Sequence, residues 1–321
     1  MTAADHGASA LSVVVPVFDE QDVLPLFVQR LRPVLDALEV DYEVLVVDDG
    51  STDATPVVLQ RARHTWPQLR VVRLRANAGH QAAISAGLER SRGELVVTID
   101  ADLQDPPELI ADMVRLAREE ALDVVYAVRD DRRSDTRFKR VTASGYYDTM
   151  RRLGADHGPT QAGDYRLMSR ATVEAVTALP EHHRVLRLVV PSLGFPSGVL
   201  TYRREERAAG TSKYPLSRML RLAVDSITGA SLAPLRLATW LGFVGALVAL
   251  VLLVYALVGF AVGLTVPGWT STFMVVTAVG GVQLLCLGIL GEYVGRTYTM
   301  QLGRPTYYVA HDSLTGEEPR D

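Results

Sequence analysis

Two long stretches without a charged residue constrain most strongly what this chain can fold into. Residues 237–264 and residues 269–291 contain no Asp, Glu, Lys or Arg. A helix of about 20 residues crosses a bilayer core about 30 Å thick, so each stretch is long enough to span a membrane. Uncharged runs of this length are rare in soluble cores, which disfavours the alternative of a buried helical hairpin. The sequence therefore predicts two membrane-spanning helices.

The residues around these stretches predict their orientation. The connection at 265–268 is short and contains Pro267, so the two spans form a tight hairpin. Five arginines flank its outer ends: Arg218, Arg221, Arg236, Arg296 and Arg304. Positive residues favour the cytoplasmic side. Residues 1–10 also lack the features of a signal peptide. We expect a multi-pass protein of the cytoplasmic membrane with both termini and the bulk of the chain in the cytoplasm.

Before the apolar stretches, short β-branched runs alternate with segments of helical periodicity. The runs at 12–17, 42–47, 69–73, 95–99 and 123–128 are typical of buried parallel strands, and the segments at 23–38, 55–63, 81–90 and 107–119 of helices. This alternation predicts a doubly wound α/β domain that binds ligands at the carboxyl ends of its strands.

These patterns divide the chain into five parts. They are a tail at 1–10, the α/β domain at 11–211, juxtamembrane amphipathic helices at 212–234, the two spans within 235–295 and a cytoplasmic tail at 296–321. The amphipathic segment suits a helix on the membrane surface and equally a helix packed on the soluble domain.

Charge and cysteine content exclude other classes of protein. The chain has 33 Lys and Arg against 37 Asp and Glu, a net charge of -4, so it lacks the basic field that nucleic-acid binding needs. The single cysteine, Cys286, excludes an intrachain disulfide and a cysteine-based metal site.

The strongest local pattern is an acidic turn directly after the run at 95–99. Asp100 and Asp102 form an Asp-x-Asp there, followed by Gln104. Mg²⁺ and Mn²⁺ prefer oxygen ligands and commonly share them with substrate phosphates, so this turn could hold either cation against a diphosphate. The alternative is a turn that only caps the helix beginning near Pro107.

Two further acidic turns follow predicted strands. Asp48 and Asp49 precede Gly50 and Ser51 after the run at 42–47, where carboxylates could accept hydrogen bonds from a nucleobase or ribose. Residues 15–20 close the first run with an aromatic and two carboxylates, although Phe18 alone could equally be a core residue. Three acidic turns at the ends of three strands predict one ligand-binding crevice.

Six motifs in order resemble those of the inverting family-2 glycosyltransferases of the GT-A fold, in particular the polyprenyl-phosphate sugar synthases. The resemblance covers residues 11–304. The motifs are Val-Pro-Val-Phe-Asp-Glu at 15–20, Val-Asp-Asp-Gly-Ser-Thr-Asp at 47–53, Gly-His-Gln-Ala-Ala at 79–83, Asp-Ala-Asp-Leu-Gln-Asp-Pro-Pro at 100–107, Gly-Asp-Tyr-Arg-Leu-Met at 163–168 and Arg-Ala-Ala-Gly-Thr-Ser-Lys-Tyr at 207–214. Phe18 replaces the more usual tyrosine, and Asp19 the more usual asparagine.

The resemblance implies a role for each matching position. The residues implied to line the nucleotide-sugar pocket are Pro16, Phe18, Glu20, Val47, Asp49, Asp100 and Ala101. Those implied to hold the metal are Asp102, Gln104 and Asp100, and Asp102 and Asp164 are the implied catalytic pair. The implied phosphate-binding cations are Arg129, Lys139, Arg207 and Lys213. The second pKa of a phosphate monoester is about 6, so the acceptor is already largely a dianion at neutral pH and hardly needs a base. We therefore expect Asp164 to orient the substrate or support the metal site rather than abstract a proton.

The expected reaction is metal-dependent, inverting transfer of a sugar from a nucleotide-sugar onto polyprenyl phosphate at the bilayer surface. UDP-glucose is the first donor to consider, with GDP-mannose, UDP-N-acetylhexosamines and UDP-aminoarabinose derivatives left open. Two other classes are a polysaccharide-forming synthase, whose Gln-x-x-Arg-Trp motif is not found, and a nucleotide-binding membrane anchor without activity. Glycines at 242, 245, 280, 281 and 288 leave a homo-oligomer open, because they also suit an intrachain hairpin.

Overall fold

The computed structural model describes residues 9–129, 162–180, 184–202, 233–262 and 268–314. The chain forms two compact units. The first comprises Met1–Lys213 together with Pro305–Asp321, and the second is Tyr214–Arg304. The first unit is therefore built from both ends of the chain.

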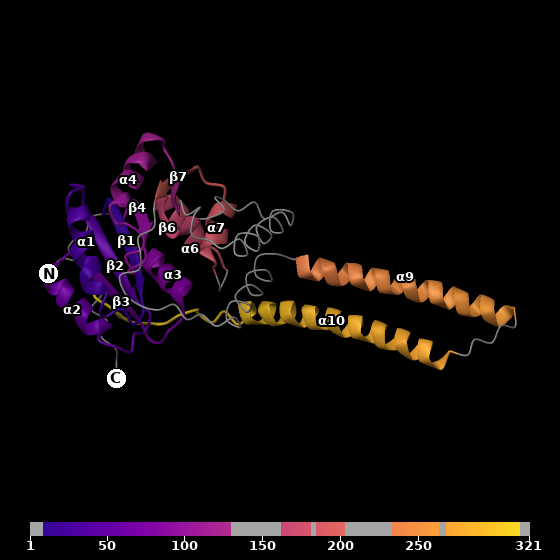
Figure 1. The fold of residues 1–321 in the computed structure, drawn as a ribbon. Coiled ribbons are helices and arrows are strands. Elements are labelled where there is room, and N and C mark those ends of the chain that lie inside the picture. The colour runs from indigo at the N-terminus through magenta and orange to yellow at the C-terminus, as the bar shows by residue number, and fades with distance from the viewer. Residues whose placement is uncertain (1–8, 130–161, 181–183, 203–232, 263–267, 315–321) are drawn as a thin grey trace. The chain divides into compact units, whose positions relative to one another are not determined.

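The described part of the first unit contains an eight-stranded sheet in the order β7-β5-β6-β4-β1-β2-β3-β8 (Figure 1). Its strands are β1 (Leu11–Val17), β2 (Tyr42–Asp48), β3 (Leu69–Leu74), β4 (Leu95–Thr98), β5 (Val124–Arg129), β6 (Ala162–Ser169), β7 (Ser197–Tyr202) and β8 (Val309–Asp312). The first four strands pair in parallel, and β1 lies between β2 and β4. The strand order therefore reverses at β1, where doubly wound sheets open a crevice for ligands.

The sequence predicted β1 to β5 closely but not the partner of β5. β6 runs antiparallel to both β4 and β5 and separates them, so β5 is not a direct neighbour of the first four strands. β7 pairs in parallel with β5. The sheet is therefore mixed rather than all-parallel, with β6 inserted antiparallel between β4 and β5.

Helices cover the two faces of the sheet and create two cores. One core contains α1 (Leu24–Asp36), α2 (Thr55–Thr65) and α4 (Leu109–Glu119), and the other contains α3 (His80–Arg90), α6 (Arg170–Thr177) and α7 (Leu186–Ser192). All seven residues of β1 are buried, because its side chains alternate between the two cores. A Cβ at Gly87 of α3 would lie 2.3 Å from Val14 Cγ1, so glycine is what lets α3 approach β1.

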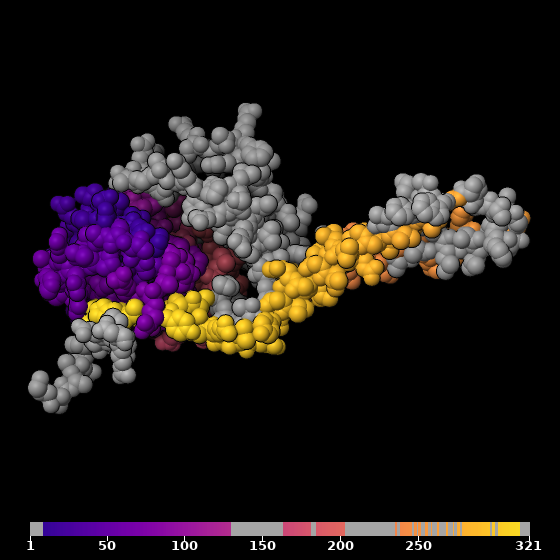
Figure 2. Space-filling view, turned by 90° about the horizontal axis from the view of Figure 1, so that it is seen from below, coloured from indigo at the N-terminus to yellow at the C-terminus, as the bar shows by residue number. Residues whose placement is uncertain are grey.

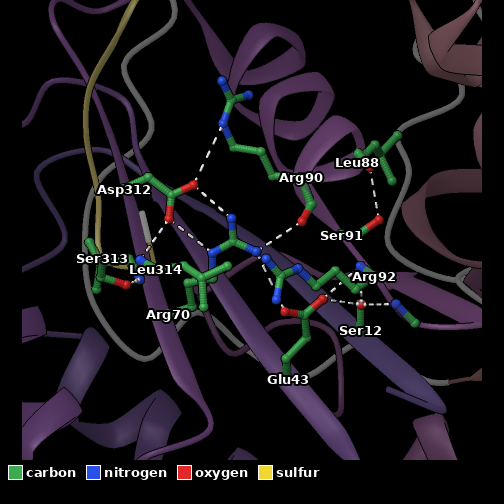
Figure 3. Close-up of polar contacts among 12 residues, drawn as sticks. Ser12, Glu43, Arg70, Leu88, Arg90, Ser91, Arg92, Asp312, Ser313 and Leu314 are labelled. Carbon is green, nitrogen blue, oxygen red and sulfur yellow. Dashed lines mark hydrogen bonds and ion pairs between the residues drawn. The ribbon is translucent and has the colours of Figure 1, made fainter. Parts of the chain in front are cut away.

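β8 joins the sheet from the far end of the sequence, antiparallel to β3. The buried Arg70 guanidinium donates two hydrogen bonds to Asp312, from Nε to Oδ1 at 3.0 Å and from Nη2 to Oδ2 at 2.6 Å (Figure 3). Arg90 Nε approaches Asp312 Oδ2 at 3.8 Å, and Ser313 Oγ accepts from the backbone N–H of Val71 at 2.9 Å. The C-terminal segment, yellow in Figure 2, lies against the purple residues of the sheet unit.

The second unit contains two long helices, α9 (Ala233–Ala261) and α10 (Trp269–Gln301), which lie side by side (Figure 1). The Cys286 S–H of α10 donates to the Ala238 carbonyl of α9 at 3.3 Å. Among the described residues, one stretch is long and apolar enough to cross a membrane, Ala278–Gly295 within α10.

The C-terminal part differs from the predicted tail at 296–321. α10 continues ten residues past the predicted end of the second span at 291, to Gln301, and residues 309–312 form β8. The tail prediction missed β8 because the partner that stabilises Asp312 is Arg70, more than 200 residues away in the sequence. The predicted amphipathic segment at 212–234 is described only from residue 233.

Candidate active site

The turns after β1 and β2 lie next to each other and are joined by hydrogen bonds. Ser51 Oγ accepts from the Asp19 backbone N–H at 3.0 Å, and Asp19 Oδ1 accepts from the Thr52 N–H at 2.8 Å. Thr55 Oγ1 accepts from the Glu20 N–H at 2.9 Å. Gly50 has a positive φ of 73°, which glycine adopts without strain. Phe18 is 41% exposed at this edge, so the alternative that it is a core residue was wrong.

Asp49 connects the second turn to the start of α3. Its Oδ1 accepts from the Ala78 N–H at 2.7 Å and its Oδ2 from the Gly79 N–H at 2.9 Å. Desolvation raises the pKa of Asp49, and these two bonds partly oppose the rise. Asp49 therefore fixes the backbone that presents His80, the first residue of α3.

The acidic turn after β4 lies on the other side of β1. Ala101 and Gln104 are buried, and Asp102 Oδ1 accepts from the Gln104 backbone N–H at 3.1 Å. The pKa of Asp100 is raised to about 6, mainly by desolvation and also by the negative charges of Asp164, Asp105 and Asp102, while His80 opposes the rise. Such mutual repulsion among carboxylates is what a bound divalent cation relieves.

No group of three or more His, Cys, Asp or Glu side chains among the described residues is arranged to hold a metal. The turn instead offers the carboxylates of Asp100 and Asp102 and the amide of Gln104. A site of this kind suits Mg²⁺ or Mn²⁺, which complete their coordination with substrate phosphates and water.

His80 and Asp164 bring α3 and β6 to the same place. His80 Nε2 lies 3.4 Å from Asp164 Oδ2 and 3.6 Å from Asp100 Oδ1. Gln81 Nε2 donates to Asp164 Oδ2 at 2.9 Å, while its Oε1 accepts from the backbone N–H of Leu186 at 3.0 Å. Asp164 therefore lies beside the acidic turn, and His80 and Gln81 of α3 hold its carboxylate in place.

Two arginines complete the surroundings of Asp164. The buried Arg166 donates from Nη2 to Asp164 Oδ1 at 3.1 Å, and Arg187 Nη2 lies 3.8 Å from Asp164 Oδ2. Desolvation raises the pKa of Asp164, but the contact with His80 and the charges of Arg166 and Arg187 outweigh it and hold that pKa well below its usual range. Asp164 is therefore ionised throughout the neutral range.

Arg129 lies at the end of β5 beside another buried carboxylate. Its Nη2 is 3.4 Å from Asp105 Oδ1, and its Nε donates to Tyr202 Oη at 3.1 Å. The Tyr202 hydroxyl in turn donates to Asp105 Oδ1. A cation, a phenol and a carboxylate thus connect β5, β7 and the turn after β4.

Comparison with known proteins gives the family. The family model described as "Glycosyl transferase family 2" matches residues 12–177, more than half of the chain. The uncharacterized glycosyltransferase YkcC of Bacillus subtilis is 39% identical over 93% of this chain and 92% of its own length. The chain belongs to glycosyl transferase family 2.

Other relatives extend this glycosyltransferase assignment. The prophage bactoprenol glucosyl transferase homolog of Escherichia coli is 33% identical over 93% of this chain and 98% of its own length. The crystal structure of glucosyl-3-phosphoglycerate synthase from Mycobacterium tuberculosis, in complex with Mn²⁺, UDP and phosphoglyceric acid, superposes with a TM-score of 0.53. It is 22% identical and covers 68% of this chain and 76% of that one, so it supports the GT-A fold.

The structure of this family-2 glycosyltransferase brings most of the predicted residues to one edge of the sheet. The strand-end residues gathered there are Pro16, Phe18, Glu20, Val47, Asp49, Asp100, Ala101, Asp102, Gln104, Arg129 and Asp164. Their binding roles stay predictions. Lys139, Arg207 and Lys213 lie outside the described residues.

Sequence reasoning assigned no role to several residues of this region. They are His80, Gln81, Asp105, Arg187 and Tyr202. Three of them lie in or next to quoted motifs: His80 and Gln81 in the run at 79–83, and Asp105 directly after Gln104. Arg187 and Tyr202 lie in segments without a recognisable motif, so only the fold relates them to the site.

Proposed function

We propose that this glycosyltransferase transfers a hexose from a nucleotide-sugar, with UDP-glucose as the first candidate, to polyprenyl phosphate at the cytoplasmic face of a membrane. The observation that carries the proposal is similarity over nearly the full length, 93% of this chain, to proteins named bactoprenol glucosyl transferases. Bactoprenol is a polyprenyl lipid, and the shared length includes the two long helices as well as the catalytic sheet.

The reaction needs little from a general base. The acceptor phosphate is largely a dianion at neutral pH, since its second pKa is about 6. Its oxygen attacks the anomeric carbon, a carbon–oxygen bond forms, and the bond from that carbon to the diphosphate breaks with inversion. Asp164, whose pKa is depressed, is a weak base and suits orientation of neighbouring cations and substrate.

Charge neutralisation is the larger requirement, because a phosphate must approach a diphosphate. Arg129, with Lys139, Arg207 and Lys213, would supply positive charge to these groups. Asp100, Asp102 and Gln104 would hold a divalent cation. When bound, that cation stabilises the negative charge that develops on the departing nucleoside diphosphate.

The return of the chain to the sheet supports a two-span membrane hairpin. Segments on both sides of the second unit belong to the first unit, since β8 pairs with β3. The chain must therefore cross a membrane an even number of times between them. If α10 crosses, a second crossing is required, and α9 with its uncharged residues 237–261 is the helix suited to it.

The exposed surface of the two helices supports the same arrangement. Large apolar side chains such as Trp240 and Phe243 on α9 and Leu284 and Leu287 on α10 are at least 60% exposed. Exposed apolar surface on this scale marks a contact with lipid or another protein.

The test is incubation of the purified full-length protein with radiolabelled UDP-glucose, polyprenyl phosphate and Mn²⁺ or Mg²⁺, followed by organic extraction. A labelled, mild-acid-labile lipid is the expected product. Label confined to a water-soluble polymer would instead support a polysaccharide-forming synthase.

A donor screen decides the sugar. GDP-mannose, UDP-N-acetylhexosamines and UDP-aminoarabinose derivatives are compared with UDP-glucose at equal concentration. A lipid product with none of them, from a protein that still binds nucleotide, would overturn the proposed activity in favour of a binding anchor.

A further inference from the structure

Arg129 and Tyr202 are opposite each other at the ends of two parallel strands. They are the last residues of β5 and β7 and are register partners. In the sequence, Lys139 follows Arg129 by ten residues, and Arg207 and Lys213 follow Tyr202 by five and eleven residues; all three are proposed to contact phosphates. The bond from Arg129 Nε to Tyr202 Oη, 3.1 Å long, joins the two strand ends directly.

Two of the three groups in this cluster are fixed by burial. Asp105 is 2% exposed and Tyr202 is 8% exposed, and the Tyr202 ring packs edge-on against Tyr165 at 6.1 Å between centroids. The Arg129 side chain is 29% exposed. In this cluster Asp105 and Tyr202 are buried and held in place, whereas the Arg129 guanidinium is partly exposed to solvent.

The bonds of Arg129 leave part of its guanidinium free for a ligand. Arginine has five N–H donors, and Tyr202 and Asp105 accept from Nε and Nη2. Within the described ranges, the remaining N–H groups of Arg129 have no hydrogen-bond acceptor. The Arg129 guanidinium also lies next to Gly163, because a Cβ added to that glycine would be 3.7 Å from Arg129 Nη2. Gly163 directly precedes Asp164 in β6.

Tyr202 suits the task of holding this arginine. A phenol donates one hydrogen bond and accepts another, so Tyr202 can donate to Asp105 and accept from Arg129 at once. A free arginine side chain loses rotamer entropy when it binds a ligand, and hydrogen bonds that already fix its Nε reduce that loss.

We propose that Tyr202 and Asp105 are positioning residues that hold the Arg129 guanidinium in place for the acceptor phosphate. Asp105 directly follows Gln104 in the chain, so the same contacts connect the acceptor cation to the turn proposed to hold the donor diphosphate. The inference rests on the proposed function and adds two residues that meet the acceptor only through Arg129.

The test is Tyr202→Phe in the full-length protein, which keeps the ring and removes only the hydroxyl. Initial rates are measured against polyprenyl phosphate at saturating nucleotide-sugar, and against nucleotide-sugar at saturating polyprenyl phosphate. We expect KM for polyprenyl phosphate to rise about tenfold, as for loss of a hydrogen bond to a charged group, and KM for the donor to change less than twofold.

Tyr165→Phe is the matched control. Its hydroxyl is also buried and donates to the same turn, to the Pro106 carbonyl at 2.9 Å, but has no contact with Arg129 among the described residues. KM for polyprenyl phosphate is expected to change less than twofold in this variant. Equal changes in the two variants, or equal changes in both KM values of Tyr202→Phe, would show a merely structural role and overturn the inference.

A double-mutant cycle with Arg129→Lys tests the action through Arg129. Once the guanidinium is gone, removal of the Tyr202 hydroxyl should raise the acceptor KM by less than twofold further. Additive effects would overturn the inference. Because wild type and Arg129→Lys are assayed in parallel, absence of any lipid product in wild type marks failure of the proposed function instead.

Asp105→Asn gives a second test of the positioning role, which does not require that the Tyr202→Phe variant folds. If Asp105 positions Arg129, the variant raises KM for polyprenyl phosphate. If Asp105 only offsets the charge of Arg129, its neutralisation strengthens phosphate binding and lowers that KM. A lowered KM would therefore contradict the positioning role.

Discussion

The pair formed by Asp164 and Arg166 links a residue of the proposed active site to the stability of the fold. Arg166 is 1% exposed, and besides Asp164 its Nη atoms donate to the Leu186 and Gly163 carbonyls at 2.9 and 2.8 Å. Those carbonyls satisfy its hydrogen bonds but carry no full charge. Asp164 therefore supplies the compensating negative charge that a buried guanidinium needs.

Asp164→Asn should consequently weaken the fold as well as the activity. We expect the free energy of unfolding of the sheet unit to fall by about 3 kcal/mol, because one partner of a buried ion pair is left alone. Urea unfolding followed by tryptophan fluorescence measures the change. An unchanged unfolding midpoint would contradict the pairing.

Asp102→Asn should lower the activity without weakening the fold. Asp102 is proposed to hold the metal, and an asparagine in its place keeps a side-chain oxygen that can accept from the Gln104 N–H, so transfer should fall at least 100-fold while the unfolding midpoint changes little. The matched control is Asp112→Asn, an exposed carboxylate on α4 that pairs with Arg115. Full activity of Asp102→Asn with added Mg²⁺ or Mn²⁺ would refute the metal assignment.

Among the elements, β8 shows how a short strand is stabilised by one residue. Asp312 is buried, and desolvation raises its pKa, but the hydrogen bonds from Arg70 and the Leu314 N–H and the charges of Arg70 and Arg90 lower it below the usual value. A carboxyl group with a depressed pKa stabilises the fold when it is ionised, and that contribution is lost as pH falls through its folded pKa.

Asp312→Asn should therefore destabilise the sheet unit in a pH-dependent manner. At pH 7 we expect a loss of about 2 kcal/mol, since Arg70 loses the charge of its closer carboxylate partner and keeps only Glu43, whose Oε2 lies 3.6 Å from Arg70 Nη1. The difference from wild type should be complete above the unfolded pKa of about 3.9 and shrink as pH falls below it. Unfolding midpoints between pH 3 and pH 7 measure this, and a difference that grows at low pH would contradict the assignment.

The elements also show what sequence patterns can predict. β1 to β4 were predictable because each is a buried β-branched run, and their pairing in parallel brings the acidic turns to one edge. β7, with the sequence Ser-Gly-Val-Leu-Thr-Tyr, has no such pattern, and β8 depends on a distant arginine. The positions of Asp100 and Asp164 followed from motifs, whereas the contacts of Tyr202 and Arg187 arise only when distant segments meet.

On the scale of the whole molecule, the two-unit organisation predicts the sidedness of the loop between the helices. If α9 and α10 form the proposed two-span hairpin, Gly268→Cys in a Cys286→Ser background should react with a membrane-impermeant maleimide on intact cells, because two crossings put this loop on the opposite side of the membrane from the sheet unit. Gln60→Cys, exposed on α2, should react only after permeabilisation. Reaction of both cysteines under the same condition would contradict the two-span hairpin.

The pairing of β3 with β8 also sets an order of events during synthesis. The ribosome completes β3 about 240 residues before it reaches Asp312, and both α9 and α10 are made in between. Until then the outer edge of β3 has unpaired backbone N–H and C=O groups, and Arg70 has no Asp312 to bind. β8 is therefore the last strand to join the sheet, and a chain in which it does not reach β3 leaves that edge exposed to proteases and chaperones.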